Sequence, residues 1–352
     1  MAKQVPLRQC LGIDVSKNHL QVNLCNLEAD QRIRVVASTK FDNTAKGLEK
    51  LYAWSTKHQV SGLEVKVVME ATGVYHESAA YFLHEKGFGV SVVLPNKSKA
   101  YAKSLNAKSK TDSIDAKILA QLGLERNLEF WRPASHNMRR IKRLCRERVA
   151  LQEQKTITLN QLHARSFEYN PEKNSKKRGD QLVKFIEKQI AQVEQDIQST
   201  IASDEILKEK IDRICVVKGL GWITVVTIIA ETDGFALFKN KGQLVSFSGY
   251  DVVQHESGSS VKGSTRISKK GNRHIRRALH FPALMAVRHE PQFKNLFERT
   301  FEKSFIKMKA YVAVQRKLLI LIYTLFKNDT VYDPNYHLNK LVTQNRQELC
   351  PA

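Results

Sequence analysis

The sequence predicts an α/β domain at the N-terminus, followed by mainly helical segments. Two observations support this fold class. Up to residue 94, short apolar stretches alternate with helical patterns, which is typical of a central sheet covered by helices. From about residue 138 to residue 214, glycine is nearly absent and apolar residues recur at positions i, i+3 and i+4, which is typical of long helices.

The first region has the residue patterns of a sheet and its covering helices. Alternating and β-branched apolar residues predict strands at residues 10–13, 21–24, 33–38, 64–69 and 89–94. Apolar residues at helical spacing predict helices at residues 44–56 and 78–86. A further helix is expected to begin at Thr111 or Asp112. We expect this domain to span residues 1–137.

The remaining regions are expected to be helical. Two long helices are predicted within residues 138–211, separated by a polar break at residues 170–179. They would form a helical hairpin or coiled-coil arm, acting either as a spacer or in oligomerisation. Residues 212–328 are expected to form a mainly helical C-terminal domain, in which the short apolar run 318–326 is a buried helix. Residues 329–352 are polar and are expected to form a loose tail.

Basic residues outnumber acidic residues by a wide margin. The chain of 352 residues contains 57 Lys and Arg against 35 Asp and Glu, which gives a net charge of +22. A surplus of this size favours a polyanionic partner, and nucleic acid is the usual one. Charge alone does not separate an enzyme acting on DNA from a basic ribosome-like or RNA-coating protein.

Three features of the sequence indicate a cytoplasmic protein. The five cysteines are scattered singly, without the paired spacing of a zinc site or a disulfide framework. The N-terminus lacks the pattern of a signal peptide. No stretch approaches the roughly 18 uninterrupted apolar residues that a membrane-spanning helix needs, so no membrane partner is expected.

Four acidic residues stand where a metal site could form. Asp14 and Glu70 each follow a predicted strand, so in a parallel arrangement both would lie at the same edge of the sheet. Asp112 and Asp115 share one face of the helix that begins there. Converging carboxylates need a cation, and Mg²⁺, with Mn²⁺ as a possible substitute, prefers oxygen ligands. Taken singly, each residue has an ordinary alternative as a turn former or a helix N-cap.

The surroundings of the acidic residues suggest a nucleic-acid substrate and argue against ATP. Lys108 and Lys110 precede the second acidic pair and would bring positive charge beside it, unless they form a plain solvated loop. The run GIDVS also opens ATPases of the sugar-kinase and actin-like type. No Gly-rich phosphate loop follows it here, so no nucleotide cofactor is expected.

A glycine turn interrupts the apolar run that opens the third region. Lys218, Gly219 and Gly221 lie between two apolar helical segments, a pattern that suits a helix-hairpin-helix turn. The backbone N–H groups of such a turn can bind a phosphate without reading sequence. The alternative is a tight helix connection without a ligand.

A Ser- and Gly-rich loop follows, and it is strongly basic. Its serines, at positions 257, 259, 260, 264 and 268, are indistinguishable as nucleophiles from the sequence alone, because each would need a base, a metal or a dense positive field. The alternative is a nucleic-acid-binding loop with no covalent role. The basic residues expected to bind nucleic acid here are Lys262, Arg266, Lys269, Lys270, Arg273, Arg276 and Arg277.

Four separated motifs occur in order along nearly the whole chain: GIDVSK, MEATGVY, KTDSIDAKILA and ESGSSVKGSTRISKKGNRHIRRAL. Together they resemble the DEDD insertion-sequence transposases, the bridge-RNA-guided serine recombinases to which the Piv-type DNA invertases are related. The resemblance implies a RuvC-like, RNase H-type N-terminal domain, a coiled-coil arm and a C-terminal transposase domain. One departure is the stretch at residues 248–252, which lacks the proline often found before the serine loop.

The resemblance also implies roles for individual residues. Asp14, Glu70, Asp112 and Asp115 would hold the metal, and Ser257 would be the nucleophile. The implied partners are target DNA, donor DNA and a structured noncoding bridge RNA that pairs with both. The implied assembly is a homotetramer in a bacterial, nucleoid-associated setting.

The sequence therefore predicts a transposase, a DNA recombinase that cuts and rejoins strands through a covalent phosphoserine. Two alternatives stay open. One is a RuvC-type metal-dependent junction nuclease that uses water in place of the serine. The other is a basic RNA- or DNA-binding protein without catalysis.

Overall fold

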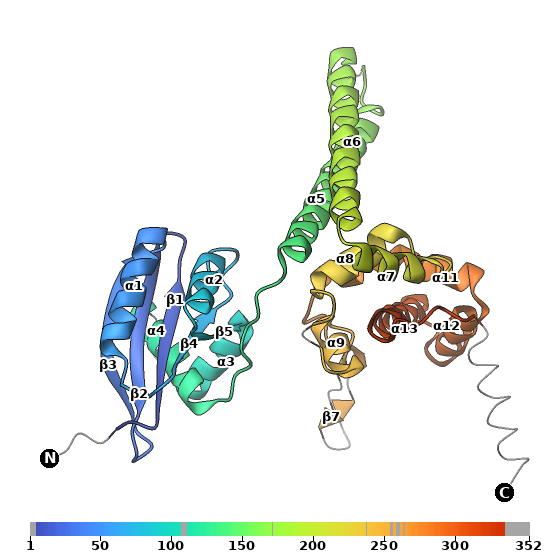
Figure 1. The fold of residues 1–352 in the computed structure, drawn as a ribbon. Helices are drawn as coiled ribbons and strands as arrows, with labels where there is room; N and C mark the ends of the chain where they lie inside the picture. Colours follow the sequence, from blue (N-terminus) through green and yellow to red (C-terminus); the bar gives the residue numbers. More distant parts are fainter. Residues whose placement is uncertain are drawn as a thin grey trace, which may run out of the picture. The chain divides into compact units, whose positions relative to one another are not determined.

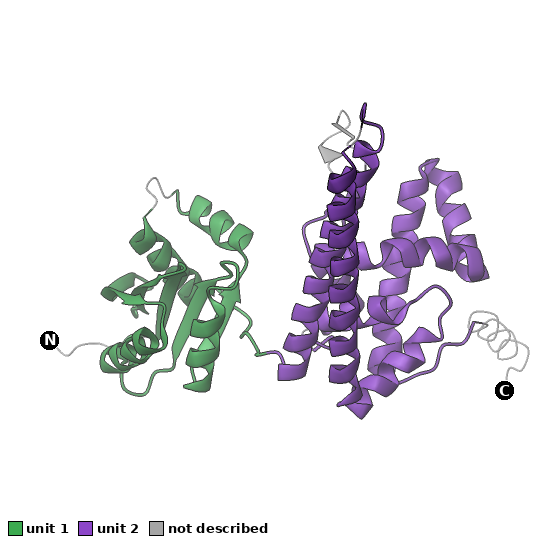
Figure 2. Ribbon diagram, turned by 90° about the horizontal axis from the view of Figure 1, so that it is seen from above, with its two compact units in different colours: residues 1–133 green, residues 134–352 purple. Residues whose placement is uncertain are grey.

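The computed structural model describes residues 5–106, 111–170, 172–236, 238–253, 256–257, 261–262 and 265–334. The chain divides into two compact units, residues 1–133 and residues 134–352 (Figure 2). The first boundary lies four residues before the one expected from the sequence, and the expected boundary between residues 211 and 212 lies inside a helix. Each unit is described by itself below.

The first unit is built on a mixed five-stranded sheet. Its strands are β1 (Arg8–Val15), β2 (His19–Leu27), β3 (Ile33–Asp42), β4 (Val65–Glu70) and β5 (Gly89–Val93). They lie in the order β3-β2-β1-β4-β5 (Figure 1). The first three strands are antiparallel neighbours, whereas β4 is parallel to β1 and β5 is parallel to β4. Each of the five strands that the residue patterns predicted is present, so that prediction is confirmed.

Helices cover both faces of this sheet. On one face, α1 (Ala45–His58) and α2 (Glu77–Glu85) pack against Leu11 and Ile13. On the other face, α3 (Pro95–Ser104) and α4 (Asp112–Glu125) bury Cys10 and Val68. Adjacent residues of β1 therefore contribute to opposite cores, as the alternation of side chains along a strand requires. The expected α/β class of this unit is confirmed.

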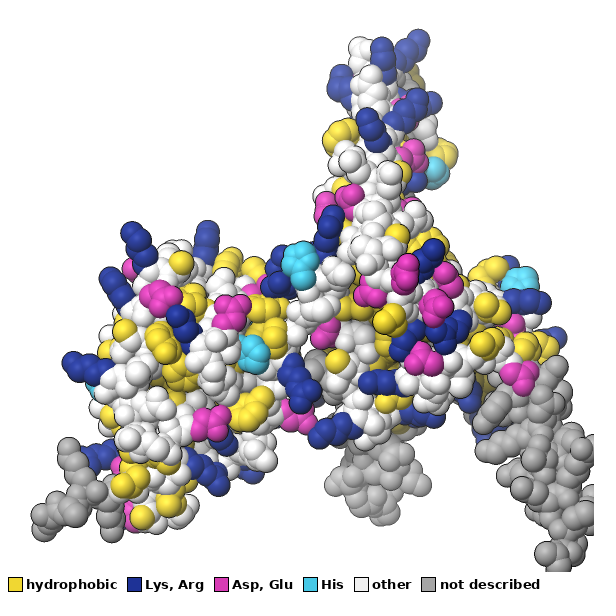
Figure 3. All heavy atoms as spheres, viewed as in Figure 1, with side chains coloured by type: hydrophobic (Ala, Val, Ile, Leu, Met, Phe, Trp, Pro, Cys, Tyr) yellow, Lys and Arg dark blue, Asp and Glu magenta, His cyan; other side chains and the backbone are white. Residues whose placement is uncertain are grey.

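The second unit begins with a helical hairpin, the arm, formed by α5 (His136–Arg165) and α6 (Lys173–Ala202) (Figure 1). The predicted polar break at residues 170–179 is wrong from residue 173 onward, because residues 173–179 belong to α6. Glu172 caps this helix by accepting from the backbone N–H groups of Asn174 and Ser175. Exposed Lys173, Lys176 and Lys177 gather at the end of the arm (Figure 3).

The rest of the second unit packs around one apolar core. Its helices are α7 (Glu205–Cys215), α8 (Trp222–Glu231), α9 (Lys241–Phe247), α10 (Arg273–Ala278), α11 (His280–His289), α12 (Pro291–Ser304) and α13 (Lys307–Asn328). Two short antiparallel pairs join them: β6 (Val252–Val253) with β9 (Arg266–Ile267), and β7 (Glu256–Ser257) with β8 (Val261–Lys262). Val225, Ile229, Leu318 and Ile322 are fully or almost fully buried in the core, which confirms that residues 318–326 lie in a buried helix. Among the described residues, no helix has the length and apolar content needed to cross a membrane.

Candidate active site

The first candidate site lies at one edge of the mixed sheet. The parallel register of β1 and β4 pairs Ile13 with Met69. Asp14 and Glu70 are the next residues of these two strands, and both side chains are half-buried. The prediction that these two carboxylates end neighbouring parallel strands is confirmed.

The second acidic pair reaches the same edge through the packing of α4. A Cβ at Gly12 would lie 2.0 Å from the carbonyl oxygen of Ala116, and one at Gly123 would lie 2.5 Å from Sγ of Cys10. Helix α4 therefore runs antiparallel to β1 and in direct backbone contact with it. This direction brings the first turn of α4 to the end of β1 that carries Asp14.

Asp112 and Asp115 both belong to that first turn. Thr111 caps the helix by accepting from the backbone N–H of Ile114, so the expected helix start is confirmed. Asp115 is half-buried and directly precedes Ala116, the residue that touches β1, whereas Asp112 is exposed. The helix N-terminus itself favours negative charge, which eases the placement of two carboxylates there.

Two polar side chains that the sequence did not single out hold this edge together. The buried hydroxyl of Ser98, from α3, donates to Oε2 of Glu70 at 2.5 Å. The amide of Asn43 donates to the carbonyl oxygens of Ser16 and Tyr75, at 3.0 Å each. Ser16 follows β1 and Tyr75 follows β4, so Asn43 ties together the loops after the two acidic strand ends.

The four acidic residues approach the same edge of the sheet, but this alone does not make them metal ligands. Within the described ranges, no three His, Cys, Asp or Glu side chains are grouped closely enough to hold a metal ion. Lys108 and Lys110, expected beside the acidic pocket, lie outside the described residues. The ligand roles of the four acidic residues therefore stay predictions.

The glycine turn of the second unit has a packing role. It joins α7 to α8, with Gly221 at the N-cap of α8. Gly219 has a φ of +93°, and a Cβ there would lie 2.8 Å from the backbone nitrogen of Ala286 in α11. Lys218 and Gly221 are exposed. Close approach to α11 explains Gly219, and the phosphate-binding role of the turn stays a prediction.

The predicted nucleophile lies in a small hairpin. Ser257 is in β7 and pairs with Val261 of β8, and β6 with β9 closes the base of the same segment. Ser259, Ser260 and Ser264 lie outside the described residues, as do the side chains of Ser257 and Lys262. Ser268 has a structural partner, because its hydroxyl donates to Oδ1 of Asp251 at 2.8 Å.

The basic residues that follow the hairpin fall into two groups. Arg276 donates to the carbonyl oxygen of Ser248 at 2.8 Å, and Arg277 forms an ion pair with Glu153 of the arm. These two guanidinium groups have structural roles that the sequence did not reveal. The others are all exposed and have no ion pair within the described part of the chain: Arg266, Lys269, Lys270 and Arg273.

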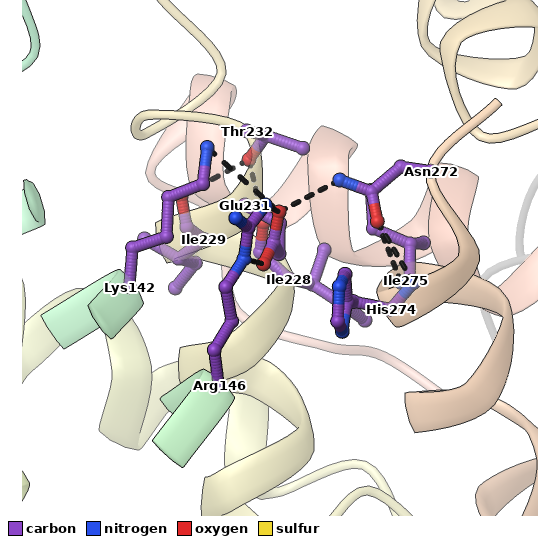
Figure 4. A network of polar contacts seen from close by, with 9 residues as sticks. All are labelled: Lys142, Arg146, Ile228, Ile229, Glu231, Thr232, Asn272, His274 and Ile275. Carbon is purple, nitrogen blue, oxygen red and sulfur yellow. Dashed lines mark hydrogen bonds and ion pairs between the residues drawn. The ribbon is translucent and has the colours of Figure 1, made fainter. Parts of the chain in front are cut away.

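A buried carboxylate anchors this region to the arm (Figure 4). Glu231, at the end of α8, accepts from Nε and Nη2 of Arg146 at 2.7 and 2.9 Å and from the amide of Asn272 at 2.7 Å. The Nζ of Lys142 lies 3.8 Å from Oε2 of Glu231. Burial alone would raise the pKa of Glu231, but the hydrogen bonds and charges of these partners hold that pKa below its usual value.

The same network positions the start of α10. Oδ1 of Asn272 accepts from the backbone N–H groups of His274 and Ile275, so Asn272 is the N-cap of α10. Glu231 thus fixes the side chain that caps α10, the helix that follows the serine hairpin. The sequence offered one signal for this role, a single carboxylate at the end of an apolar helical run.

Comparison with known proteins identifies the family. Residues 11–171 match a family model of DEDD transposases of the IS110 type, described as "Transposase". Residues 211–298 match the model described as "Transposase IS116/IS110/IS902 family". The two matches cover both structural units and contain every predicted catalytic residue. The chain belongs to the IS110-type transposase family, a family of DNA recombination enzymes.

Several individual proteins are also similar to this chain. The pilin gene-inverting protein of Moraxella bovis is 26% identical over 328 residues, covering 93% of this chain and 98% of its own length. The transposase of insertion element IS1111A from Coxiella burnetii is 22% identical, covering 92% and 90%. Among solved structures, T. thermophilus RuvC in complex with a Holliday junction substrate matches with a TM-score of 0.26 and 13% identity. That match covers 35% of this chain and 99% of the RuvC chain.

Proposed function

We propose that this protein cuts and rejoins DNA strands through Ser257, using a divalent cation held by Asp14, Glu70, Asp112 and Asp115. The observation that carries the proposal is the meeting of two acidic strand ends and an acidic helix start at one edge of the sheet. The fold assignment that goes with it is a RuvC-like, RNase H-type unit. The sheet order and the antiparallel β1–β3 meander support that assignment.

The acidic residues suit a hard divalent cation. All four offer carboxylate oxygens, and the exposed or half-buried position of each leaves access for an ion and a phosphate. Mg²⁺ fits this donor set best, and Mn²⁺ has similar preferences. When bound, such an ion lowers the energy of a phosphodiester displacement by stabilising charge on the attacking and leaving oxygens. The hydroxyl of Ser98 would keep Glu70 oriented toward it.

The covalent step conserves the energy of the broken bond. The Oγ of Ser257 forms a bond to phosphorus, and the bond from phosphorus to one deoxyribose oxygen breaks. The serine proton leaves as the departing oxygen gains one. Attack by a hydroxyl of a new strand end reverses the sequence and restores the free serine. No bond energy is lost, so the reaction needs no nucleotide cofactor.

An RNA guide and a homotetramer complete the proposal. The net charge of +22 supports binding of a large polyanion, and the family resemblance indicates a bridge RNA whose loops pair with target and donor DNA. The protein should bind the noncoding RNA of its own element far better than a shuffled RNA of equal length. Equal affinity for both RNAs would contradict the guide role, because electrostatic attraction alone discriminates little.

One assay separates the proposed recombinase from its two alternatives. The protein is incubated with DNA, with and without Mg²⁺, and extracted with phenol, which removes DNA that is covalently attached to protein. A Mg²⁺-dependent adduct supports the recombinase. Cut DNA without an adduct supports the junction nuclease, and intact DNA supports a binding protein.

Matched variants connect the result to the acidic edge. Asp14→Asn and Glu70→Gln should abolish the adduct while DNA binding persists, because loss of a metal ligand disables chemistry first. The control is Asp30→Asn, an exposed carboxylate in the loop between β2 and β3 at the other end of the sheet. Normal adduct formation by either active-edge variant contradicts the metal site.

A further inference from the structure

A groove with a volume of about 940 Å³ lies in the second unit. One wall is the β6–β9 pair, contributing Val252, Arg266 and Ile267, and the other wall consists of α12 and α13. These two helices pack side by side and join at residues 305–306 (Figure 1). The groove is separate from the acidic edge of the sheet, which belongs to the first unit.

All the charged side chains that line the groove are basic. No acidic residue is among the described residues that line it. Its charged members are all exposed, and none of them has an ion pair within the described ranges. They are Arg266, Lys269, Arg299, Lys309, Arg316 and Lys317.

Some cations elsewhere on this unit are neutralised by a carboxylate, in contrast to the six that line the groove. Lys210 pairs with Asp329 at 3.0 Å, and Arg213 pairs with Glu209 at 3.1 Å. Six unpaired cations around one groove repel one another unless a polyanion lies among them. Charge complementarity therefore indicates an anionic occupant with several charges.

The apolar residues that line the groove limit which kind of polyanion fits it. They include Val252, Ile267, Leu296, Met308 and Val312. Val252 is 62% exposed and Met308 is 55% exposed. A duplex keeps its bases stacked inside and would leave this apolar surface uncovered. An unpaired DNA strand can place its bases against the apolar side chains and its phosphates against the basic ones.

We infer that this groove binds an unpaired DNA strand next to the phosphodiester that reacts. Strands β6 and β9 flank residues 254–265, the segment that contains Ser257, and both strands line the groove. A DNA strand bound in the groove would therefore pass directly to or from the hairpin that carries Ser257. This inference names the substrate form for the proposed recombinase and rests on that proposal. The chain's own residues 335–352 are a poor occupant, because they include two basic residues and one acidic residue.

The test measures binding without cleavage. Binding of a labelled single-stranded DNA, its duplex and an RNA of the same sequence is followed by fluorescence anisotropy over a range of salt concentrations. All proteins carry Ser257→Ala, so strand cutting does not enter the measurement. The groove variant adds Arg299→Ala and Arg316→Ala, and the matched control adds Lys303→Ala and Lys327→Ala, exposed cations on the same helices outside the groove.

The groove variant should lose roughly tenfold or more in affinity for single-stranded DNA at moderate salt. Its logarithmic salt slope should fall by about 1.4, which is about 0.7 for each of the two phosphate contacts. Duplex binding should fall less, and the control should match the parent for both DNAs. A single strand of abasic sites should bind the parent more weakly than normal DNA, because it has no bases to cover the apolar side chains of the groove.

Four results would overturn the inference. Unchanged single-strand affinity and slope would show that the groove does not bind DNA. Equal losses for single strand and duplex would indicate a general electrostatic surface, and a preference for the RNA would assign the groove to RNA. A change in oligomeric state of the groove variant in sedimentation would assign it to a second copy of the chain. None of these outcomes affects the phenol-extraction test, so failure of the groove and failure of the recombinase are distinguishable.

Discussion

Glu231 is the side chain whose replacement should most disturb the second unit. Its carboxylate is 1% exposed and holds Arg146 from the arm and Asn272 from the cap of α10. Glu231→Gln keeps the size of the side chain and removes its charge. Arg146 would then lose its bidentate partner, and the cap of α10 would lose one of its restraints.

The magnitude of the loss in stability depends on how exposed the partners of Glu231 are to water. Removing one member of a fully buried ion pair costs about 3–5 kcal/mol of unfolding free energy. The Arg146 side chain is 48% exposed, so water can solvate it once Glu231 is neutral. We therefore expect Glu231→Gln to cost about 2–3 kcal/mol, below the buried-pair range.

A second Arg–Glu pair, between α5 and α6, provides the control. Arg148 and Glu194 lie 2.6 Å apart, with side chains 24% and 33% exposed. Glu194→Gln should cost about 0.2–1 kcal/mol, as partly solvated pairs do. Urea unfolding followed by circular dichroism gives both values, and hydrogen exchange should show faster opening of α10 only in Glu231→Gln. Equal stability of the two variants would refute the anchoring role of Glu231.

The stabilisation by Glu231 should also depend on pH. The folded-state pKa is held below its usual value, so the group contributes its full stabilisation above the unfolded pKa, about 4.3. That contribution is lost as the pH falls through the folded-state pKa. The stability gap between the parent and Glu231→Gln should therefore be constant near neutrality and shrink below about pH 4. A gap that grows on acidification would contradict the sign of the shift.

Four further substitutions test other parts of the structure. Gly12→Ala should destabilise the first unit in thermal unfolding, since its Cβ would lie 2.0 Å from a carbonyl oxygen of α4; an unchanged melting temperature would contradict this packing. Ser98→Ala should leave the fold intact but raise the Mg²⁺ concentration needed for half-maximal recombination by roughly 10–100-fold, because Glu70 loses its donor. An unchanged Mg²⁺ dependence would remove Ser98 from the site. Arg276→Ala should lower stability, whereas Lys270→Ala should leave stability unchanged and lower the duplex salt slope by about 0.9.

The sequence predicted the acidic edge because its signals are local. Asp14 and Glu70 each follow a short apolar strand, and side-by-side parallel strands bring their ends together. The direction of α4 on β1 was not readable in advance. It depends on contacts of Gly12 and Gly123 with residues distant in the sequence, and only the structure shows that these glycines face a helix and a strand.

The remaining differences come from contacts that the residue pattern does not reveal. The polar residues 173–179 read as a break, yet the cap by Glu172 and the packing of Gly179 on Leu162 make them helical. Arg146 stands 85 residues before Glu231, so their pairing has no pattern in the sequence. The basic groove likewise combines residues from β9, α12 and α13, whose charges look like ordinary solvated positions when read along the chain.

The most direct test of the proposed chemistry is the site of covalent attachment to DNA. The protein is trapped on a suicide DNA substrate that cannot be rejoined, digested, and analysed by mass spectrometry. A nucleotide remnant should map to Ser257, and it should be absent from Ser257→Ala, because displacement of the reacting oxygen by about 1 Å already costs on the order of a hundredfold in rate. A remnant on any other residue, or cut DNA without any adduct, would contradict a Ser257 recombinase.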